Sequence, residues 1–329
     1  MQLDIEKTIA DLAVARQDRK PDPHEKPNVH KPKPCKRHLM LKVEYEQYQY
    51  KRIFWIAGYP KSGTTWVQLL LDTYLSQTPT NINNPYQYSQ NDSQTRHYQA
   101  IANNAINALH DSTLYLLRPA ALINLLTNSD TDLVLKTHHA NIGIDEGIPI
   151  IPSSLTKQAL YLVRDPRDTI IDLAQQLGLD LDEAITLLCD QNAHTARGNG
   201  HHEGHFLSDW STHIQSWTQT NTYPIAIIRY EDLLTDPEQH FALALQALGR
   251  PVEPIVLKYA IDQTALPRLQ AQEAKHGYWQ TVKGNYFQYG TIGHWQTILT
   301  KDQTKRIEKA HHQIMGQLGY KHSIESKKQ

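Results

Sequence analysis

Residues 53–75, IFWIAGYPKSGTTWVQLLLDTYL, constrain the fold more than any other stretch of the chain. An apolar run of strand length ends at Gly58, and an apolar segment typical of a helix begins near Gly63. These two glycines have the spacing of the phosphate-binding pattern G-x-x-x-x-G-K-[ST], but Thr64 stands where that pattern has its lysine, and Lys61 lies inside the loop. A strand, a tight loop and a helix in this order predict a cradle of backbone N–H groups for a phosphate or sulfate.

Composition argues against several classes of protein. The 329 residues carry 33 Lys and Arg against 34 Asp and Glu, so no overall charge favours nucleic acid or a membrane surface. Two cysteines provide neither a disulfide framework nor zinc-ligand spacing. The charged N-terminus does not resemble a signal peptide, and no apolar run is long enough for a membrane span. We therefore expect a cytoplasmic protein with neither nucleic acid nor membrane as a partner; the sequence contains no signal for an oligomeric state.

The chain is expected to divide into three parts. Residues 1–38 combine a short amphipathic helix (3–17) with a Pro- and Lys-rich tail, residues 39–322 form the folded domain, and 323–329 form a C-terminal tail. Four apolar runs predict strands, namely 53–58, 132–136, 159–163 and 225–229. Helical segments between them are predicted at 63–77, 166–177, 182–190, 207–221 and 237–249.

Continuous apolar strands between helices predict an α/β domain with a mainly parallel central sheet flanked by helices. In such a sheet, ligands collect beyond the carboxyl ends of the strands. Residues 78–98 and 276–300 fit neither a strand nor a helix, and we interpret both as loops that cover a site.

The loop after the first strand carries the donors that an anion needs. Ser62, Thr64 and Thr65 supply hydroxyl groups, Lys61 supplies a charge, and Trp66 offers a face on which a base could stack. An ordinary strand–turn–helix connection with a stray lysine is the alternative interpretation.

The second strand ends in Lys136-Thr137-His138-His139. Two residues that lie two positions apart on a strand point to the same side of the pleat, so Lys136 and His138 can serve one site. Group transfer to a hydroxyl uses a base near the acceptor oxygen and positive charge on the leaving oxygen. A solvated turn is the alternative for an isolated pair of histidines.

The segment YPKSGTTW, residues 59–66, resembles the 5′-phosphosulfate loop of the cytosolic sulfotransferase family, which uses 3′-phosphoadenosine 5′-phosphosulfate (PAPS). The resemblance covers roughly residues 45–320 and implies the P-loop-like sulfotransferase fold. It implies that Lys61 contacts the bridging oxygen of the donor and that Gly63 belongs to the loop. From the family pattern K-T-H it also implies that His138 is the general base and Lys136 a second cation.

The same resemblance implies a nucleotide site at the later strand ends. Arg164 would bind the 3′-phosphate, Tyr230 and Thr264 would contact the adenine, and Gly290 would belong to a second 3′-phosphate segment, 288-QYGTIGHW. Arginine suits phosphate because its planar guanidinium binds two oxygens at once.

The chain departs from the family pattern at three positions. Asp172 replaces a serine eight residues after the arginine, and Gln288 and Tyr289 replace two cations. Lost charge-assisted hydrogen bonds, at about 1.5–3 kcal/mol each, would weaken donor binding or relax the requirement for a 3′-phosphate.

The resulting hypothesis is a PAPS-dependent sulfotransferase that acts on a hydroxyl or amine of a small-molecule acceptor, leaves adenosine 3′,5′-bisphosphate (PAP) and needs no metal. One alternative is a P-loop kinase or NTPase with Asp165 as the acid that binds Mg²⁺. A non-catalytic nucleotide-binding module is another. We do not expect the run 201-HHEGH to bind a metal, because it has neither the spacing of a metal helix nor cysteine partners.

Overall fold

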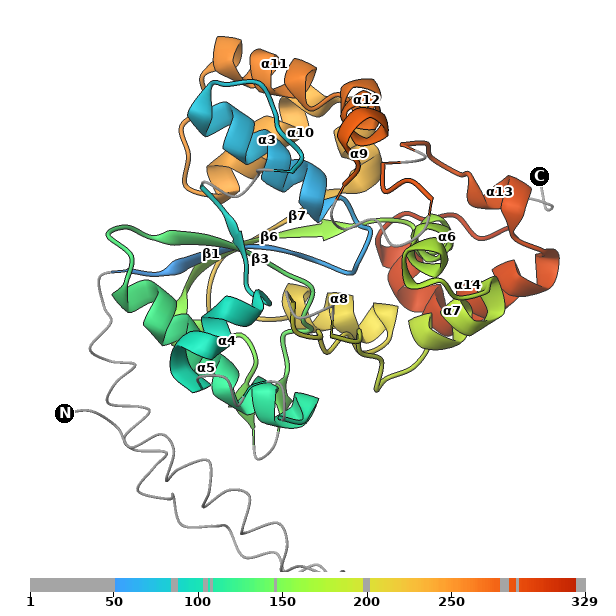
Figure 1. The fold of residues 1–329 in the computed structure, drawn as a ribbon. Coiled ribbons are helices and arrows are strands. Elements are labelled where there is room, and N and C mark those ends of the chain that lie inside the picture. The colour runs from blue at the N-terminus through green and yellow to red at the C-terminus, as the bar shows by residue number, and fades with distance from the viewer. Residues whose placement is uncertain are drawn as a thin grey trace, which may run out of the picture.

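Five parallel strands form the centre of the fold in the order β2-β3-β1-β6-β7 (Figure 1). In chain order they are β1 (Ile53–Gly58), β2 (Gln90–Asn91), β3 (Leu133–Thr137), β6 (Thr156–Val163) and β7 (Ile225–Arg229). A separate antiparallel hairpin pairs β4 (Gly143–Ile144) with β5 (Ile148–Pro149). This computed structural model describes residues 51–83, 88–102, 106, 109–144, 147–197, 202–278, 284–287 and 290–323. The predicted parallel sheet of an α/β domain is confirmed.

Helices cover both faces of this sheet (Figure 1). They are α3 (Thr64–Ser76), α4 (Thr95–Ala102), α5 (Asp111–Thr127), α6 (Pro166–Leu177), α7 (Leu181–Leu188), α8 (Trp210–Thr218), α9 (Tyr230–Thr235), α10 (Pro237–Ala247), α11 (Pro254–Gln263), α12 (Leu266–His276), α13 (Trp295–Ile298) and α14 (Lys301–Gln317), with one 3-10 turn at Ser153–Leu155.

The pleat of β1 divides the core into two parts. Alternate side chains point to opposite faces of a strand, and all six residues of β1 are buried. Ile53, Trp55 and Ala57 belong to one apolar cluster, with side chains from α5, α6, α7, α8 and α14. Phe54 and Ile56 belong to the other, with side chains from α3, α10 and α11. A continuous apolar strand was therefore the correct signal for a central position between two layers of helices.

The predicted elements agree closely with the observed ones where the apolar pattern is strong. β1 and β7 have the predicted bounds, and β3 is displaced by one residue. β6 begins three residues earlier than predicted, because its first residues, Thr156-Lys157-Gln158, are polar. All five predicted helices are present within three residues at each end.

The two segments interpreted as covering loops contain regular structure in part. Residues 78–98 include β2 and the beginning of α4, and 276–300 include α13. Their role as covers stays a prediction. The helix predicted at 3–17 and the domain boundary at residue 39 lie outside the described residues, as do 324–329.

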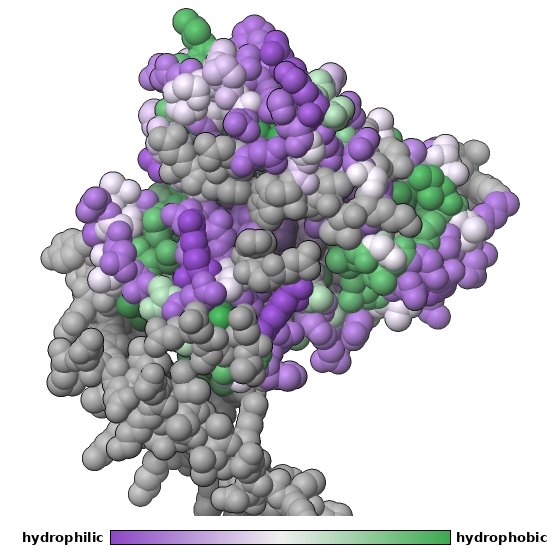
Figure 2. All heavy atoms as spheres, in the orientation of Figure 1, coloured by the Kyte–Doolittle hydropathy of each residue, from purple (hydrophilic) through white to green (hydrophobic). Residues whose placement is uncertain are grey.

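Hydrophilic side chains predominate around the middle of the face shown in Figure 2, and apolar ones gather beside α6 and α13. Within the described residues, we find no helix that is both long and apolar enough to cross a membrane.

Candidate active site

The loop between β1 and α3 has a backbone that only certain residues adopt easily. Gly63 has φ of +96°, and a Cβ at this position would lie 2.7 Å from the ring of Tyr230. Lys61 also has a positive φ, of +71°. Gly63 is the N-cap residue of α3. Because glycine has no side chain, no capping side chain of this residue occupies the first N–H groups of the helix. The loop therefore leaves the first N–H groups of α3 without a capping side chain, and anion binding at this helix start stays a prediction.

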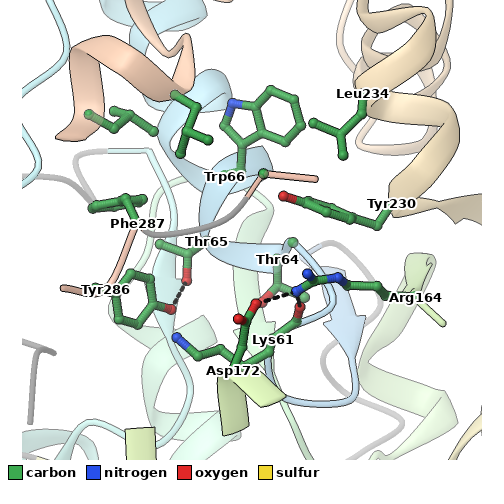
Figure 3. Close-up of a pocket in the computed structure, with 14 residues that line it drawn as sticks. Lys61, Thr64, Thr65, Trp66, Arg164, Asp172, Tyr230, Leu234, Tyr286 and Phe287 are labelled. Carbon is green, nitrogen blue, oxygen red and sulfur yellow. Dashed lines mark hydrogen bonds and ion pairs between the residues drawn. The ribbon is translucent and has the colours of Figure 1, made fainter. Parts of the chain in front are cut away.

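A pocket opens directly over this helix start (Figure 3). The space inside it, counted out to its open mouth, is about 660 Å³. Rings of Trp66 and Tyr230 lie on one side of it, and the charged groups lie on the other. The lining comprises Lys61, Gly63, Thr64, Thr65, Trp66, Arg164, Asp172, Tyr230, Leu234, Leu266, Leu269, Tyr286, Phe287 and Gly290.

The pocket brings together most of the residues predicted to bind a nucleotide. Eight of them line it: Lys61, Gly63, Thr64, Thr65, Trp66, Arg164, Tyr230 and Gly290. Ser62 does not line it; its side chain is buried, and its hydroxyl has no hydrogen-bond partner among the described residues. Lys136, His138 and Thr264 lie outside the lining.

The two lysines are joined through Thr65 and Tyr286. Lys136 Nζ donates to Thr65 Oγ1 at 3.0 Å, and the same oxygen shares a hydrogen bond with the Tyr286 hydroxyl, also at 3.0 Å. Lys61 Nζ lies 3.7 Å from the centre of the Tyr286 ring, within the range of a cation–π contact. Sequence reasoning missed Tyr286, since it lies more than 200 residues away from Thr65 and the motif around it is only aromatic.

Both lysines have unusually low pKa values for the same main reason. Burial disfavours the charged form and lowers the pKa of Lys61 to about 8, although the nearby Asp172 carboxylate opposes this shift. Burial likewise lowers the pKa of Lys136 to about 8, with Lys61 adding repulsion and Asp92 opposing it. Two cations, Lys136 buried and Lys61 partly exposed, whose charge is incompletely balanced form a site that an anion would stabilise.

His138 has a defined tautomer. Its Nδ1 lies 2.7 Å from the Gly58 carbonyl oxygen, which can only accept, so Nδ1 carries the proton and the neutral ring has its lone pair on Nε2. Burial and the charge of Lys136 hold the pKa of His138 well below its usual value. A neutral imidazole with its lone pair on Nε2 can accept a proton.

A buried histidine from α8 fixes the backbone of His138. His213 Nε2 donates to the His138 carbonyl oxygen at 3.0 Å, and its Nδ1 accepts from the Tyr161 hydroxyl at 2.7 Å. Trp210, His213 and Trp217 are all fully buried. All three are therefore core residues, and His213 also positions His138.

Arg164 is held by three neighbours. Its Nη1 donates to the Asp172 carboxylate at 2.5 Å and to the Lys61 carbonyl at 3.1 Å, and its guanidinium lies 4.6 Å from the centre of the Tyr230 ring. Asp172 therefore lies in the pocket and points towards the predicted phosphate-binding arginine (Figure 3).

Trp66 and Thr264 are connected behind the pocket. Trp66 Nε1 donates to the Thr264 backbone carbonyl at 2.9 Å. The Thr264 side chain is fully buried, and its hydroxyl donates to the Ala260 carbonyl. Thr264 thus orients Trp66, while its predicted contact with a base stays a prediction.

Arg167 and Asp168 lie in the first turn of α6. Both are buried. Arg167 pairs with Asp165 and with Glu308 of α14, each at 2.7 Å. The Asp168 carboxylate accepts the backbone N–H groups of Gly293 and Trp295 at 2.8 Å each. It thereby anchors the segment that follows Gly290.

The acid proposed for a kinase-type magnesium site is already engaged. Asp165 caps α6 by accepting the Arg167 backbone N–H at 2.9 Å, and both of its carboxylate oxygens accept from the Arg167 guanidinium. It does not line the pocket above α3. This geometry gives the kinase alternative no support.

One group of side chains in the described residues has metal-ligand spacing. Asp92, His139 and His205 offer atoms that lie within 4.8 Å of one another. Asp92 is paired with Arg118 in the core, however. His139 Nδ1 accepts the Phe206 backbone N–H at 3.0 Å, which places the ring proton on Nε2 and leaves no lone pair for a cation in this tautomer. The expectation of no metal stays a prediction.

Comparison with known proteins is consistent with this geometry. The family model described as "Sulfotransferase domain" matches residues 51–319. The chain is 23% identical to cytosolic sulfotransferase 3 of Arabidopsis thaliana, over 77% of this chain and 73% of that protein. Two solved structures share the fold. A mouse sulfotransferase complexed with PAP has a TM-score of 0.51 and 15% identity, covering 83% of this chain and 89% of the other. Retinol dehydratase in a complex with retinol and PAP has a TM-score of 0.53 and 16% identity, with coverage of 83% and 86%.

Proposed function

The chain belongs to the sulfotransferase-domain family, and from this premise we propose that it transfers a sulfuryl group from PAPS to a hydroxyl or amine of a small-molecule acceptor. One observation carries the proposal beyond family membership. Lys61 and Lys136 converge through Tyr286 and Thr65 at the start of α3, and a neutral histidine follows Lys136 by two residues.

His138 is the proposed general base. Its Nδ1–H is held by the Gly58 carbonyl, so Nε2 is the atom that takes the proton from the acceptor. The low pKa keeps the ring neutral at pH 7, as a base must be before the reaction. His213 holds the His138 backbone and acts as a positioning residue.

Lys61 and Lys136 are the proposed electrostatic groups. As the bond between sulfur and the bridging oxygen breaks, negative charge grows on the 5′-phosphate of the departing nucleotide. Two cations that already face the start of a helix stabilise that charge without reorganisation. The acceptor oxygen forms the new bond to sulfur, its proton goes to His138, and the nucleotide leaves with the electron pair.

The pocket over α3 is the proposed nucleotide site. Thr64, Thr65 and the N–H groups of the helix start would hold the 5′-phosphate, whereas the predicted contact of Ser62 is not supported, because its buried hydroxyl lies outside the pocket lining. The base would lie against Trp66 and Tyr230, whose rings pack edge to face with centroids 6.1 Å apart and line the same pocket. Arg164 and Gly290 would lie against the 3′ side of the ribose.

The domain is proposed to span residues 39–322, and the protein is proposed to be cytoplasmic. Its acceptor would be a small molecule, in line with the retinol bound in one structural neighbour. No metal is needed, because the two lysines supply the positive charge that a metal would bring.

The test is product formation from PAPS with a panel of phenols, aliphatic alcohols and amines, with and without EDTA. We expect acceptor-dependent release of PAP and an acceptor that gains one sulfuryl group, unchanged by EDTA. Mg²⁺-dependent turnover of ATP, with no transfer from PAPS to any acceptor, would overturn the proposal in favour of the kinase alternative.

A further inference from the structure

The pocket above α3 contains a carboxylate where a site for a doubly phosphorylated ligand would be expected to contain only donors. The Asp172 side chain comes from α6, is 17% exposed and lines the pocket together with Arg164. Its Oδ2 accepts from Arg164 Nη1 at 2.5 Å, so the two form a close ion pair inside the pocket (Figure 3).

This ion pair changes the charge that the pocket offers to a nucleotide. Among the described lining residues the cations are Lys61 and Arg164, and Asp172 cancels one of their charges. Arg164 is further engaged with the Lys61 carbonyl and the Tyr230 ring. The remaining positive charge lies at Lys61, beside the start of α3. The pocket is therefore built for one anionic group, at the 5′ end of a nucleotide.

The consequences differ for a phosphate and for a hydroxyl on the ribose. A phosphate placed against Arg164 would also lie against the Asp172 carboxylate, and two like charges at that distance repel. A ribose hydroxyl can donate to a carboxylate, which is how an acidic residue recognises the ribose in dinucleotide-binding folds. The pair thus accepts an unphosphorylated ribose without losing its internal bond.

We propose that the Arg164–Asp172 pair makes the site indifferent to a ribose 3′-phosphate, so that the protein also uses adenosine 5′-phosphosulfate as a sulfuryl donor. This rests on the proposed function. In this reaction the acceptor oxygen bonds to sulfur, the bond between sulfur and the bridging oxygen of the donor breaks, the acceptor proton goes to His138, and AMP leaves with the electron pair.

Calorimetric titration with PAP and with AMP tests the binding part directly. For the wild-type protein we expect the two dissociation constants to agree within threefold. Asp172→Ser releases Arg164, and we expect it to tighten PAP binding at least thirtyfold while AMP changes less than threefold. Asp182→Ser is the matched control, because it removes an aspartate that is paired with Arg306 at an exposed position. We expect this control to keep the wild-type ratio of the dissociation constants for PAP and AMP.

A second variant guards against a folding defect. Asp172→Asn keeps the shape of the side chain and removes its charge, so we expect it also to tighten the binding of PAP relative to that of AMP. Wild-type protein that binds PAP at least thirtyfold more tightly than AMP would overturn the proposal. So would two folded Asp172 variants that keep the wild-type ratio.

Transfer assays with both donors complete the test. The expected wild-type kcat/KM for adenosine 5′-phosphosulfate is within tenfold of that for PAPS, and Asp172→Ser shifts the preference towards PAPS. A wild-type enzyme that turns over PAPS alone would refute the second donor while leaving the proposed function intact. Absence of transfer from both donors would refute the proposed function, and the binding ratio would still decide the role of Asp172.

Discussion

Nucleotide binding is expected to take up protons, because the anion cradle contains two lysines whose pKa is about 8. A bound phosphate favours the charged form of each lysine and raises its pKa. At pH 8 each lysine of the free protein is about half protonated, so binding of PAP takes up about one proton in total. At pH 6.5 both lysines are already charged, and their contribution to the uptake falls to less than about 0.1.

The pH dependence of the affinity for PAP follows from the same two pKa values. At pH 9 about one tenth of each lysine is charged, so binding that requires both cations weakens about a hundredfold relative to pH 7. Affinity falls as the pH rises because the charged form of each lysine binds the anion. That form predominates below pH 8 and is lost as the pH rises through the lowered pKa.

Calorimetry in two buffers of different ionisation enthalpy measures the proton number at each pH. Lys136→Met is expected to halve the uptake at pH 8, whereas Lys305→Met, an exposed lysine on α14, leaves it unchanged. Tight binding of PAP at pH 8 with no proton uptake would show that both lysines are fully charged in the free protein, and would refute the reasoning.

Substitutions at Lys136, Tyr286 and Arg118 test other parts of the proposal, and Arg306→Met is the control for Arg118. Lys136→Met removes a charge-assisted contact worth about 1.5–3 kcal/mol, so kcat/KM for PAPS should fall about 10- to 150-fold in steady-state assays. Tyr286→Phe keeps the ring beside Lys61 and should lower kcat/KM for PAPS less than about threefold. Tyr286→Leu removes the ring and should lower it about 2- to 30-fold. Equal decreases in kcat/KM for the two variants would argue against the ring contact. Arg118→Met leaves a buried carboxylate uncompensated and should lower the free energy of unfolding by about 3–5 kcal/mol in urea. Arg306→Met, at an exposed pair, should change it by less than about 1 kcal/mol.

The sequence predicted most of the central sheet well because four of its five strands contain an apolar run, whether the strand is wholly buried, as β1 is, or lies partly exposed at the edge, as β7 does. β1 and β7 are uninterrupted apolar runs, and the bounds of both were predicted correctly. β2 has only two residues, Gln90 and Asn91, at the edge of the sheet, and so presents no apolar run to detect. Local patterns identify a strand when its own side chains form the core, and miss one that is defined only by its pairing partner.

Some residues of the site could likewise be predicted from local sequence patterns, and others could not. Arg164 directly follows β6, Lys136 is the penultimate residue of β3, and Lys61 lies three residues after β1, so the topology of a parallel sheet brings them together at one edge. The contact of Tyr286 with Thr65 and those of Asp168 with Gly293 and Trp295 join residues more than a hundred positions apart. Local periodicity contains no information about such pairs. The Asp172 carboxylate was visible as a departure from a family pattern, but only the structure places it against Arg164.

In the proposed reaction His138 takes the proton of the acceptor during sulfuryl transfer from PAPS. The most direct measurement compares wild-type protein with His138→Ala in two assays, the single-turnover rate of transfer and the dissociation constant for PAP. We expect the transfer rate to fall about 10²- to 10⁴-fold, because the general base is lost. The dissociation constant for PAP should change less than threefold, because the histidine lies outside the nucleotide pocket. A variant that transfers sulfuryl groups at the wild-type rate would contradict it.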